Sequence, residues 1–112
     1  MEFALLVFGQ ESDWDAMTEA ERAERFTANR AYGQALAEAG IRISYGARLA
    51  RPAAAEGEER AEEGVLEVGG LWIIDAPTED DALTWAARMP LSHSGRVEVR
   101  RCDRPSRPPA VA

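Results

Sequence analysis

The sequence predicts one small α+β domain, because two kinds of strand-like segment are separated by helical segments along its 112 residues. Residues 3–8 and 71–74 are unbroken apolar runs, which are typical of strands covered on both faces. Residues 41–45 and 96–100 alternate between apolar and polar side chains, which is typical of strands with one fully buried face. We therefore expect two central strands and two edge strands in a single sheet.

The first helix is predicted between a capping-box pair and a glycine. Thr18 is followed three residues later by Glu21, and Gly40 is a suitable stop signal, while residues 10–15 read as a polar connection. Such a helix has about six turns at 3.6 residues per turn. Its inward face is expected to hold residues at nearly helical spacing: Ala23, Phe26, Gly33, Leu36 and Ala37.

The second helix is predicted from Thr78 to Pro90. Asp80 and Asp81 fall in its first turn, where carboxylates suit the positive end of the helix dipole. Its apolar positions at i, i+3, i+4 and i+7 are Ala82, Trp85, Ala86 and Met89.

The order of these elements is βαββαβ. The strands are expected at residues 3–9, 41–49, 65 or 71 to 75, and 95–102. Right-handed crossovers place the first and third strands in the middle, which predicts a ferredoxin-like fold with a four-stranded antiparallel sheet. The folded domain is expected to span residues 1–102, with a solvated loop at 51–64 and a disordered Pro- and Arg-containing tail at 103–112.

Both helices cover one face of this sheet, so the other face needs a partner. The polar side chains expected on that open face come from the edge strands: Arg42, Ser44, Arg96, Glu98 and Arg100. The third strand adds either Trp72 and Ile74 or the residues of opposite parity. An apolar centre with charged edges predicts a homodimer through this face, closing into an α/β barrel around a small-molecule cavity. Alternatively, the charges of the fourth strand form only rim ion pairs.

Composition argues against several classes of partner. The net charge of −7, with scattered arginines and no lysine, argues against nucleic-acid binding. No apolar run approaches the length of a membrane span, and the start of the chain lacks a basic leader pattern. The lone Cys102 is expected to be structural and fits a reducing, cytoplasmic setting. Neither a cofactor nor a metal is expected, because dinucleotide, phosphate-loop and metal-ligand patterns are missing.

Candidate catalytic residues are few. His93 is the only histidine and lies in a loop, Asp75 ends a central strand, and Glu98 is a candidate carboxylate to orient the histidine. The ordinary alternatives are a solvated loop histidine and a turn-forming aspartate. The expected substrate-binding residues are two large aromatics and three cations, with Trp14 at a pocket mouth: Trp72, Arg42, Arg96, Arg100 and Trp14.

The chain resembles the YCII-related proteins, in particular the branch called DGPF-domain proteins. The resemblance is carried in order by residues 3–9, 36–40, 69–75, 81–90 and 95–100. It implies a ferredoxin-like protomer that dimerises into an α/β barrel.

Two departures from the family bear on function. The Asp-Gly-Pro-Phe motif is missing, and the acidic residues 57–68 occupy its region. Some YCII-like enzymes are associated with a His–Asp pair, whose positions correspond here to Asn29 and Met89. These side chains do not exchange protons near neutral pH, so this pair is not carried over.

Three functions follow as hypotheses. The first is a small-molecule-binding homodimer, such as an accessory protein. The second is a cofactor-independent isomerase, lyase or cyclase acting on a small organic substrate. The third is a non-catalytic interaction or regulatory module. A buried cavity that contains Trp72 and an arginine would favour the first two.

Overall fold

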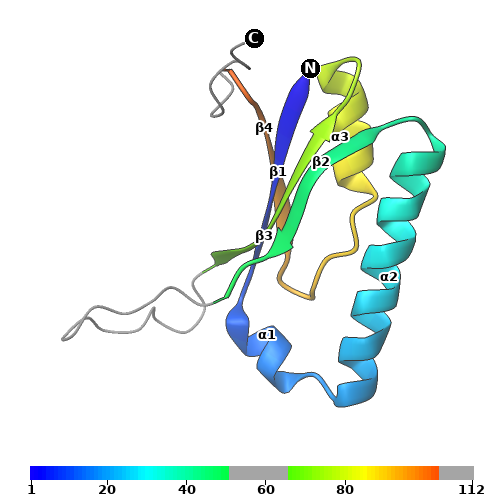
Figure 1. The fold of residues 1–112 in the computed structure, drawn as a ribbon. Coiled ribbons are helices and arrows are strands. Elements are labelled where there is room, and N and C mark those ends of the chain that lie inside the picture. Colours follow the sequence, from blue (N-terminus) through cyan, green and yellow to red (C-terminus); the bar gives the residue numbers. More distant parts are fainter. Residues whose placement is uncertain (51–65, 104–112) are drawn as a thin grey trace, which may run out of the picture.

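The computed structural model describes residues 1–50 and 66–103, where one antiparallel sheet carries helices on one of its faces (Figure 1). The elements are β1 (Glu2–Gly9), α1 (Glu11–Ala16), α2 (Glu19–Glu38), β2 (Arg42–Arg48), β3 (Glu67–Asp75), α3 (Glu79–Ala87) and β4 (Arg96–Arg101). The sheet order β2-β3-β1-β4 confirms the ferredoxin-like prediction, with the first and third strands in the middle. The expectations for 51–64 and for almost all of the tail lie outside the described residues.

The signals that bound α2 act as predicted. The Glu21 amide donates to the Thr18 hydroxyl, and the Thr18 amide donates back to the Glu21 carboxylate, both at 3.1 Å. Past the other end of the helix, Gly40 has φ +80°, a conformation that favours glycine. Local chemistry alone therefore fixes both ends of this long helix.

The segment expected to be a polar connection is instead helical, and forms α1. Its N-terminus has no side-chain cap, and it is only six residues long, so helix signals in the sequence are weak. Tertiary contacts hold it: Arg22 of α2 donates from Nε and Nη2 to the Trp14 carbonyl at 3.2 and 3.0 Å. A carbonyl near the end of α1 thus gains a donor that the local sequence does not show.

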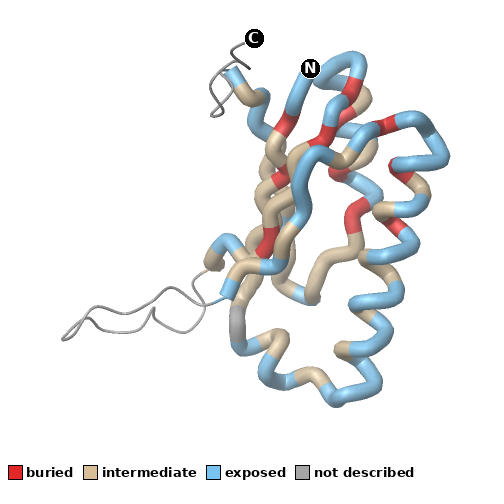
Figure 2. The backbone as a smooth tube through the Cα atoms, in the orientation of Figure 1, coloured by how far each residue is buried: buried red, intermediate tan, exposed pale blue. Residues whose placement is uncertain are grey.

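The core lies toward one end of the molecule. Its buried residues are Phe3, Leu5, Tyr32, Leu36, Ile41, Ile74, Ala76, Ala82, Ala86 and Met89. No described residue between Leu6 and Ala31 is buried, and the red segments of Figure 2 accordingly avoid α1 and the first half of α2. Ala23 and Ala37, which were predicted to face inward, are exposed, so that part of the prediction is wrong, and Phe26 is 51% exposed rather than part of the core.

The inward stripe of α2 is instead centred on Tyr32 and Leu36. These two side chains are buried, and Gly33 between them lies against the Trp72 ring. The helix therefore packs closely on the sheet through its C-terminal half. Its N-terminal half is left without a packed core beneath it.

The strand register decides which side chains face the helices. Leu5, which is fully buried, pairs with both Trp72 and Val99, so these three share the helix-covered face. Of the two alternatives for the third strand, the opposite parity is found: Leu71 and Ile73 lie on the open face.

The edge strands differ in how well they follow the prediction. Arg96, Glu98 and Arg100 pair with the open-face residues of β1, as expected. On β2, a bulge between Ile43 and Tyr45 shifts the register, so Tyr45 shares the face of its partner Ile73. Tyr45 therefore joins the open-face side chains, because one extra residue changes the alternation.

Candidate functional site

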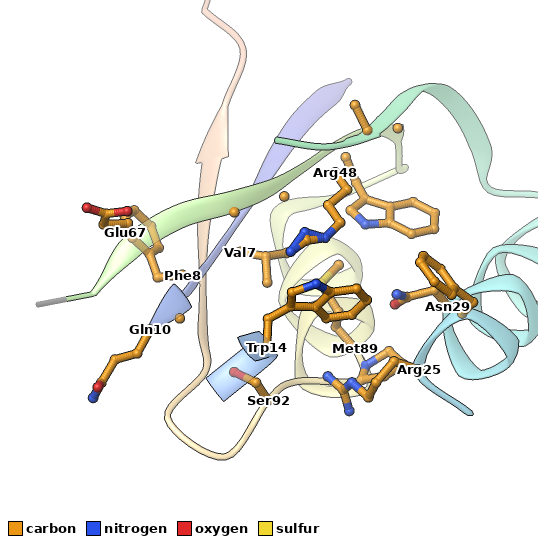
Figure 3. A pocket seen from close by; sticks show the side chains of 18 of the residues that line it. Val7, Phe8, Gln10, Trp14, Arg25, Asn29, Arg48, Glu67, Met89 and Ser92 are labelled. Atoms are coloured by element: carbon orange, nitrogen blue, oxygen red, sulfur yellow. The ribbon is translucent and has the colours of Figure 1, made fainter. Parts of the chain in front are cut away.

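A cavity of about 550 Å³ lies between α2 and the helix-covered face of the sheet, beyond the core (Figure 3). This volume is within the range of small-molecule sites in proteins. The strands β1, β2 and β3 supply its floor, and α1, α2 and the segment after α3 supply its walls. The apolar and glycine lining residues include Val7, Trp14, Met17, Phe26, Ile43, Gly46, Gly70, Trp72 and Met89.

Two glycines leave space on the sheet side of the cavity. Gly46 and Gly70 line it from the helix-facing side of the neighbouring strands β2 and β3. A Cβ atom at Gly46 would lie 3.7 Å from the Trp72 ring, and one at Gly70 would lie 3.4 Å from the Val7 Cβ. Without side chains at these positions, the Trp72 indole remains available as a flat apolar surface.

Trp72 is itself held firmly from the core side. Its ring meets the Tyr32 ring edge-on, with 5.4 Å between centroids and an interplanar angle of 87°. Tyr32 in turn donates from its hydroxyl to the Trp85 carbonyl at 2.7 Å. The indole surface that faces the cavity is therefore preorganised by the core beside it.

Trp14 forms part of the cavity wall from α1. Its ring meets Phe26 of α2 edge-on at 5.6 Å, and the Arg48 guanidinium lies 4.1 Å from its centroid. Such aromatic and cation–π contacts are each worth about 0.5–1.5 kcal/mol. They place an aromatic wall at the end of the helix layer that lacks a core.

The loop before β4 anchors α1. The Asp13 carboxylate accepts hydrogen bonds from the hydroxyl and the amide of Ser94, the latter at 3.2 Å. The Gln10 amide donates to the same hydroxyl at 3.2 Å. Hydrogen bonding to Ser94 lowers the pKa of Asp13, with smaller contributions from Ser92 and His93. The bonds to Ser94 favour the ionised carboxylate and hold Trp14 in place.

The polar groups of the cavity lie in separate places. In Figure 3, Glu67 and Gln10 lie on one side, Arg25 and Asn29 on the other, and Arg48 and Trp14 between them. Six lining side chains are polar or charged: Gln10, Arg25, Asn29, Arg48, Glu67 and Ser92. An apolar space with a few fixed polar groups is typical of a binding pocket.

Of the predicted site residues, Trp14 and Trp72 line this cavity together. The residues outside its lining are Arg42, Asp75, His93, Arg96, Glu98 and Arg100. His93 is exposed, although it lies in the loop that anchors α1. Asp75 pairs with the N-terminal ammonium of Met1 at 2.9 Å. Glu98 and Arg96 form an ion pair at 3.8 Å on the open face, as the rim alternative expected. None of the three candidate catalytic residues, His93, Asp75 and Glu98, thus lines this cavity.

Sequence reasoning did not single out Arg25 and Arg48. A signal for Arg25 exists, because Arg25, Asn29, Tyr32 and Leu36 follow one another at helical spacing on α2. Tyr32 and Leu36 are buried, so the same stripe becomes polar as it runs toward the N-terminus of the helix. A polar continuation of a core-facing stripe indicates that this part of the helix faces a wet space.

Comparison with known protein families gives a clear assignment. The YCII-related domain matches residues 1–104, nearly the whole chain, so the protein belongs to the YCII-related family. No curated protein sequence matches the chain.

Asn29 and Met89 both line the cavity, and these are the positions that the resemblance associates with a His–Asp pair. The cavity of this member therefore holds an amide and a thioether where that pair would stand.

Within the described residues, no helix has the length and apolar character needed to cross a bilayer.

Proposed function

We propose that the protein binds a small organic molecule in the cavity between α2 and the sheet. The observation that carries this proposal is the cavity itself, with two indoles, Trp14 and Trp72, in its lining. Both rings are held by neighbouring aromatic residues, so the site is formed before a ligand arrives. Binding to a preformed site avoids much of the ordering cost that weakens flexible sites.

Binding is favoured over catalysis by the chemistry of the lining. Among the described lining residues, the ionisable side chains are Arg25, Arg48 and Glu67. Arginine stays protonated, which leaves Glu67 as the one carboxylate among the described lining residues. General acid–base catalysis usually needs a pair of proton-exchanging groups around the reacting atoms. An accessory or sensing protein fits this lining better than an isomerase or lyase.

We also propose that the protein acts as a homodimer through the open face of the sheet. Leu71 and Ile73 lie there at the centre, and Tyr45 is 55% exposed beside them. The Arg96–Glu98 pair provides a charged rim. This arrangement supports the barrel-like dimer that the family resemblance implies, with one cavity in each protomer.

The binding proposal is tested by thermal-shift screening of small aromatic acids and lactones, followed by calorimetric titration of the hits. The test variant is Gly46→Leu, whose side chain would extend across Trp72 into the cavity. Ser44→Leu is the control, since it places the same leucine side chain on the same strand outside the lining. We expect Gly46→Leu to weaken binding at least tenfold and Ser44→Leu to leave it unchanged. Equal affinity for both folded variants would contradict the location of the site.

A further inference from the structure

The geometry points to a planar organic anion as the ligand of the cavity, with its negative group at Arg25 and Asn29 and its flat body against Trp14 and Trp72. This inference rests on the proposed function and adds the chemical class of the ligand. It assigns separate roles to two parts of the cavity. Arg25 and Asn29 bind the negative group of the ligand, and the aromatic walls select for its planar shape.

The charges that line the cavity favour an anion at one of its sides. The chain as a whole carries a net charge of −7, yet the described cavity lining holds two arginines against one glutamate. The positive charge of Arg25 lies away from Glu67, because the two side chains lie on opposite sides of the cavity in Figure 3. A ligand with one anionic group is attracted to the Arg25 side and repelled by Glu67 and by the rest of the acidic protein.

Arg25 has donors available for a ligand. Its side chain is half-buried and lines the cavity, and no described residue forms a hydrogen bond or ion pair with it. Glu21, one turn earlier on α2, accepts a hydrogen bond from the Thr18 amide in the capping box. The guanidinium of Arg25 therefore has unused donors at the wall of the cavity. Charge-assisted hydrogen bonds to an anion are about twice as strong as neutral ones.

Asn29 lies one turn further along the same helix and also lines the cavity. Residues four apart are neighbours on a helix surface, so Arg25 and Asn29 face the cavity together. An amide beside a guanidinium adds a further N–H donor for a carboxylate or similar oxyanion. The Trp72 indole then provides a flat apolar surface for the rest of the ligand, and Trp14, whose ring carries the Arg48 guanidinium at 4.1 Å, bounds it at the wall.

The test compares aromatic carboxylates with their neutral amides of the same shape. The pairs are benzoate with benzamide, 2-naphthoate with 2-naphthamide, and indole-3-acetate with indole-3-acetamide. Affinities are measured by calorimetry on the full chain and on three variants: Arg25→Gln, Arg25→Lys and Arg30→Gln. Arg30 is the matched control, because it is exposed on the same helix outside the lining and its loss changes the net charge equally.

We expect the carboxylate of at least one pair to bind about tenfold more tightly than its amide, a difference of about 1.4 kcal/mol. Arg25→Gln should reduce this preference to less than about twofold, Arg25→Lys should keep part of it, and Arg30→Gln should keep all of it. Amides that bind as tightly as carboxylates would overturn the anion inference while leaving a binding cavity. A preference that survives Arg25→Gln would overturn the role of Arg25. If no member of any pair binds, both the inference and the proposed function fail.

Discussion

Tyr32 shows how a single side chain connects the core to the cavity. It is 5% exposed, its ring supports Trp72, and its hydroxyl bonds the Trp85 carbonyl at 2.7 Å. Burial raises the pKa of Tyr32 to about 12, with nearby Arg88 acting in the opposite direction. The neutral phenol is thus part of the folded state.

Tyr32→Phe should lower the free energy of unfolding by about 1–2 kcal/mol, because the Trp85 carbonyl loses its donor in a part-buried place. Tyr45→Phe is the control, since Tyr45 is 55% exposed and its loss should change stability by less than about 0.5 kcal/mol. Urea unfolding followed by circular dichroism measures both. Equal stability of the two variants would contradict the role given to the Tyr32 hydroxyl.

The raised pKa of Tyr32 also makes the stability of the fold depend on pH in the alkaline range. Because the folded state holds the protonated phenol, the contribution of Tyr32 to the free energy of unfolding is complete below the ordinary tyrosine pKa of about 10. It is lost as pH rises from there toward the folded value of about 12. Urea unfolding across this range should show a decline in the wild type that Tyr32→Phe lacks. A Tyr45→Phe background isolates the phenolate absorbance of Tyr32, since the chain has only 2 tyrosines.

At the scale of elements, α1 depends on its attachments more than on its own sequence. Asp13 bonds Ser94 at one side, and Arg22 bonds the Trp14 carbonyl at the other. The hydrogen bonds from Ser94 lower the pKa of Asp13. The ionised carboxylate is therefore favoured in the folded state, and its contribution is present above the ordinary carboxyl pKa of about 3.9.

The contribution of Asp13 should be lost as pH falls through its lowered pKa, and α1 should loosen there. The indole signal of Trp14 in NMR spectra reports this directly, because Trp14 lies on α1 next to Asp13. Asp13→Asn should remove this acid transition, whereas Glu24→Gln, an exposed change on α2, should retain it. An unchanged transition in Asp13→Asn would assign it to another group.

The helices and strands show how much of the fold the sequence could predict. Local signals in the sequence were sufficient to predict α2, where the Thr18–Glu21 pair and Gly40 mark both ends. They were also sufficient for the strand order, since apolar runs and alternating segments have different burial. They were insufficient for α1, because that helix is stabilised in part by Ser94, which is distant in the sequence, and for Tyr45, because a bulge shifts the register at one residue.

The cavity was only partly predictable for a similar reason. Trp14 and Trp72 stood out as large aromatic residues in a small chain, and both line it. Arg25 gave no signal on its own, because a lone arginine on a helix is ordinarily solvated. Only the packing of α2 through Tyr32 and Leu36 shows that its N-terminal half stands over an unfilled space.

At the scale of the whole molecule, the open sheet face predicts the oligomeric state. Light scattering after size exclusion should give twice the chain mass of 12.3 kDa at micromolar concentration. Leu71→Arg, at the centre of that face, should produce a monomer, because a charge would be buried in the interface. Leu83→Arg makes the same change on α3, where Leu83 is 49% exposed, and should remain dimeric. A wild-type monomer would contradict the dimer proposal and leave the cavity proposal standing.

The most direct test of the central claim uses the three tryptophans of the chain as reporters. Trp14 and Trp72 line the cavity, whereas Trp85 packs on Tyr32 outside the lining. Indole NMR signals are followed while 2-naphthoate or another aromatic acid is added to the labelled protein. We expect saturable shifts of the Trp14 and Trp72 signals, with the Trp85 signal unchanged. Three unchanged signals throughout the acid series, or a shift of Trp85 alone, would contradict it.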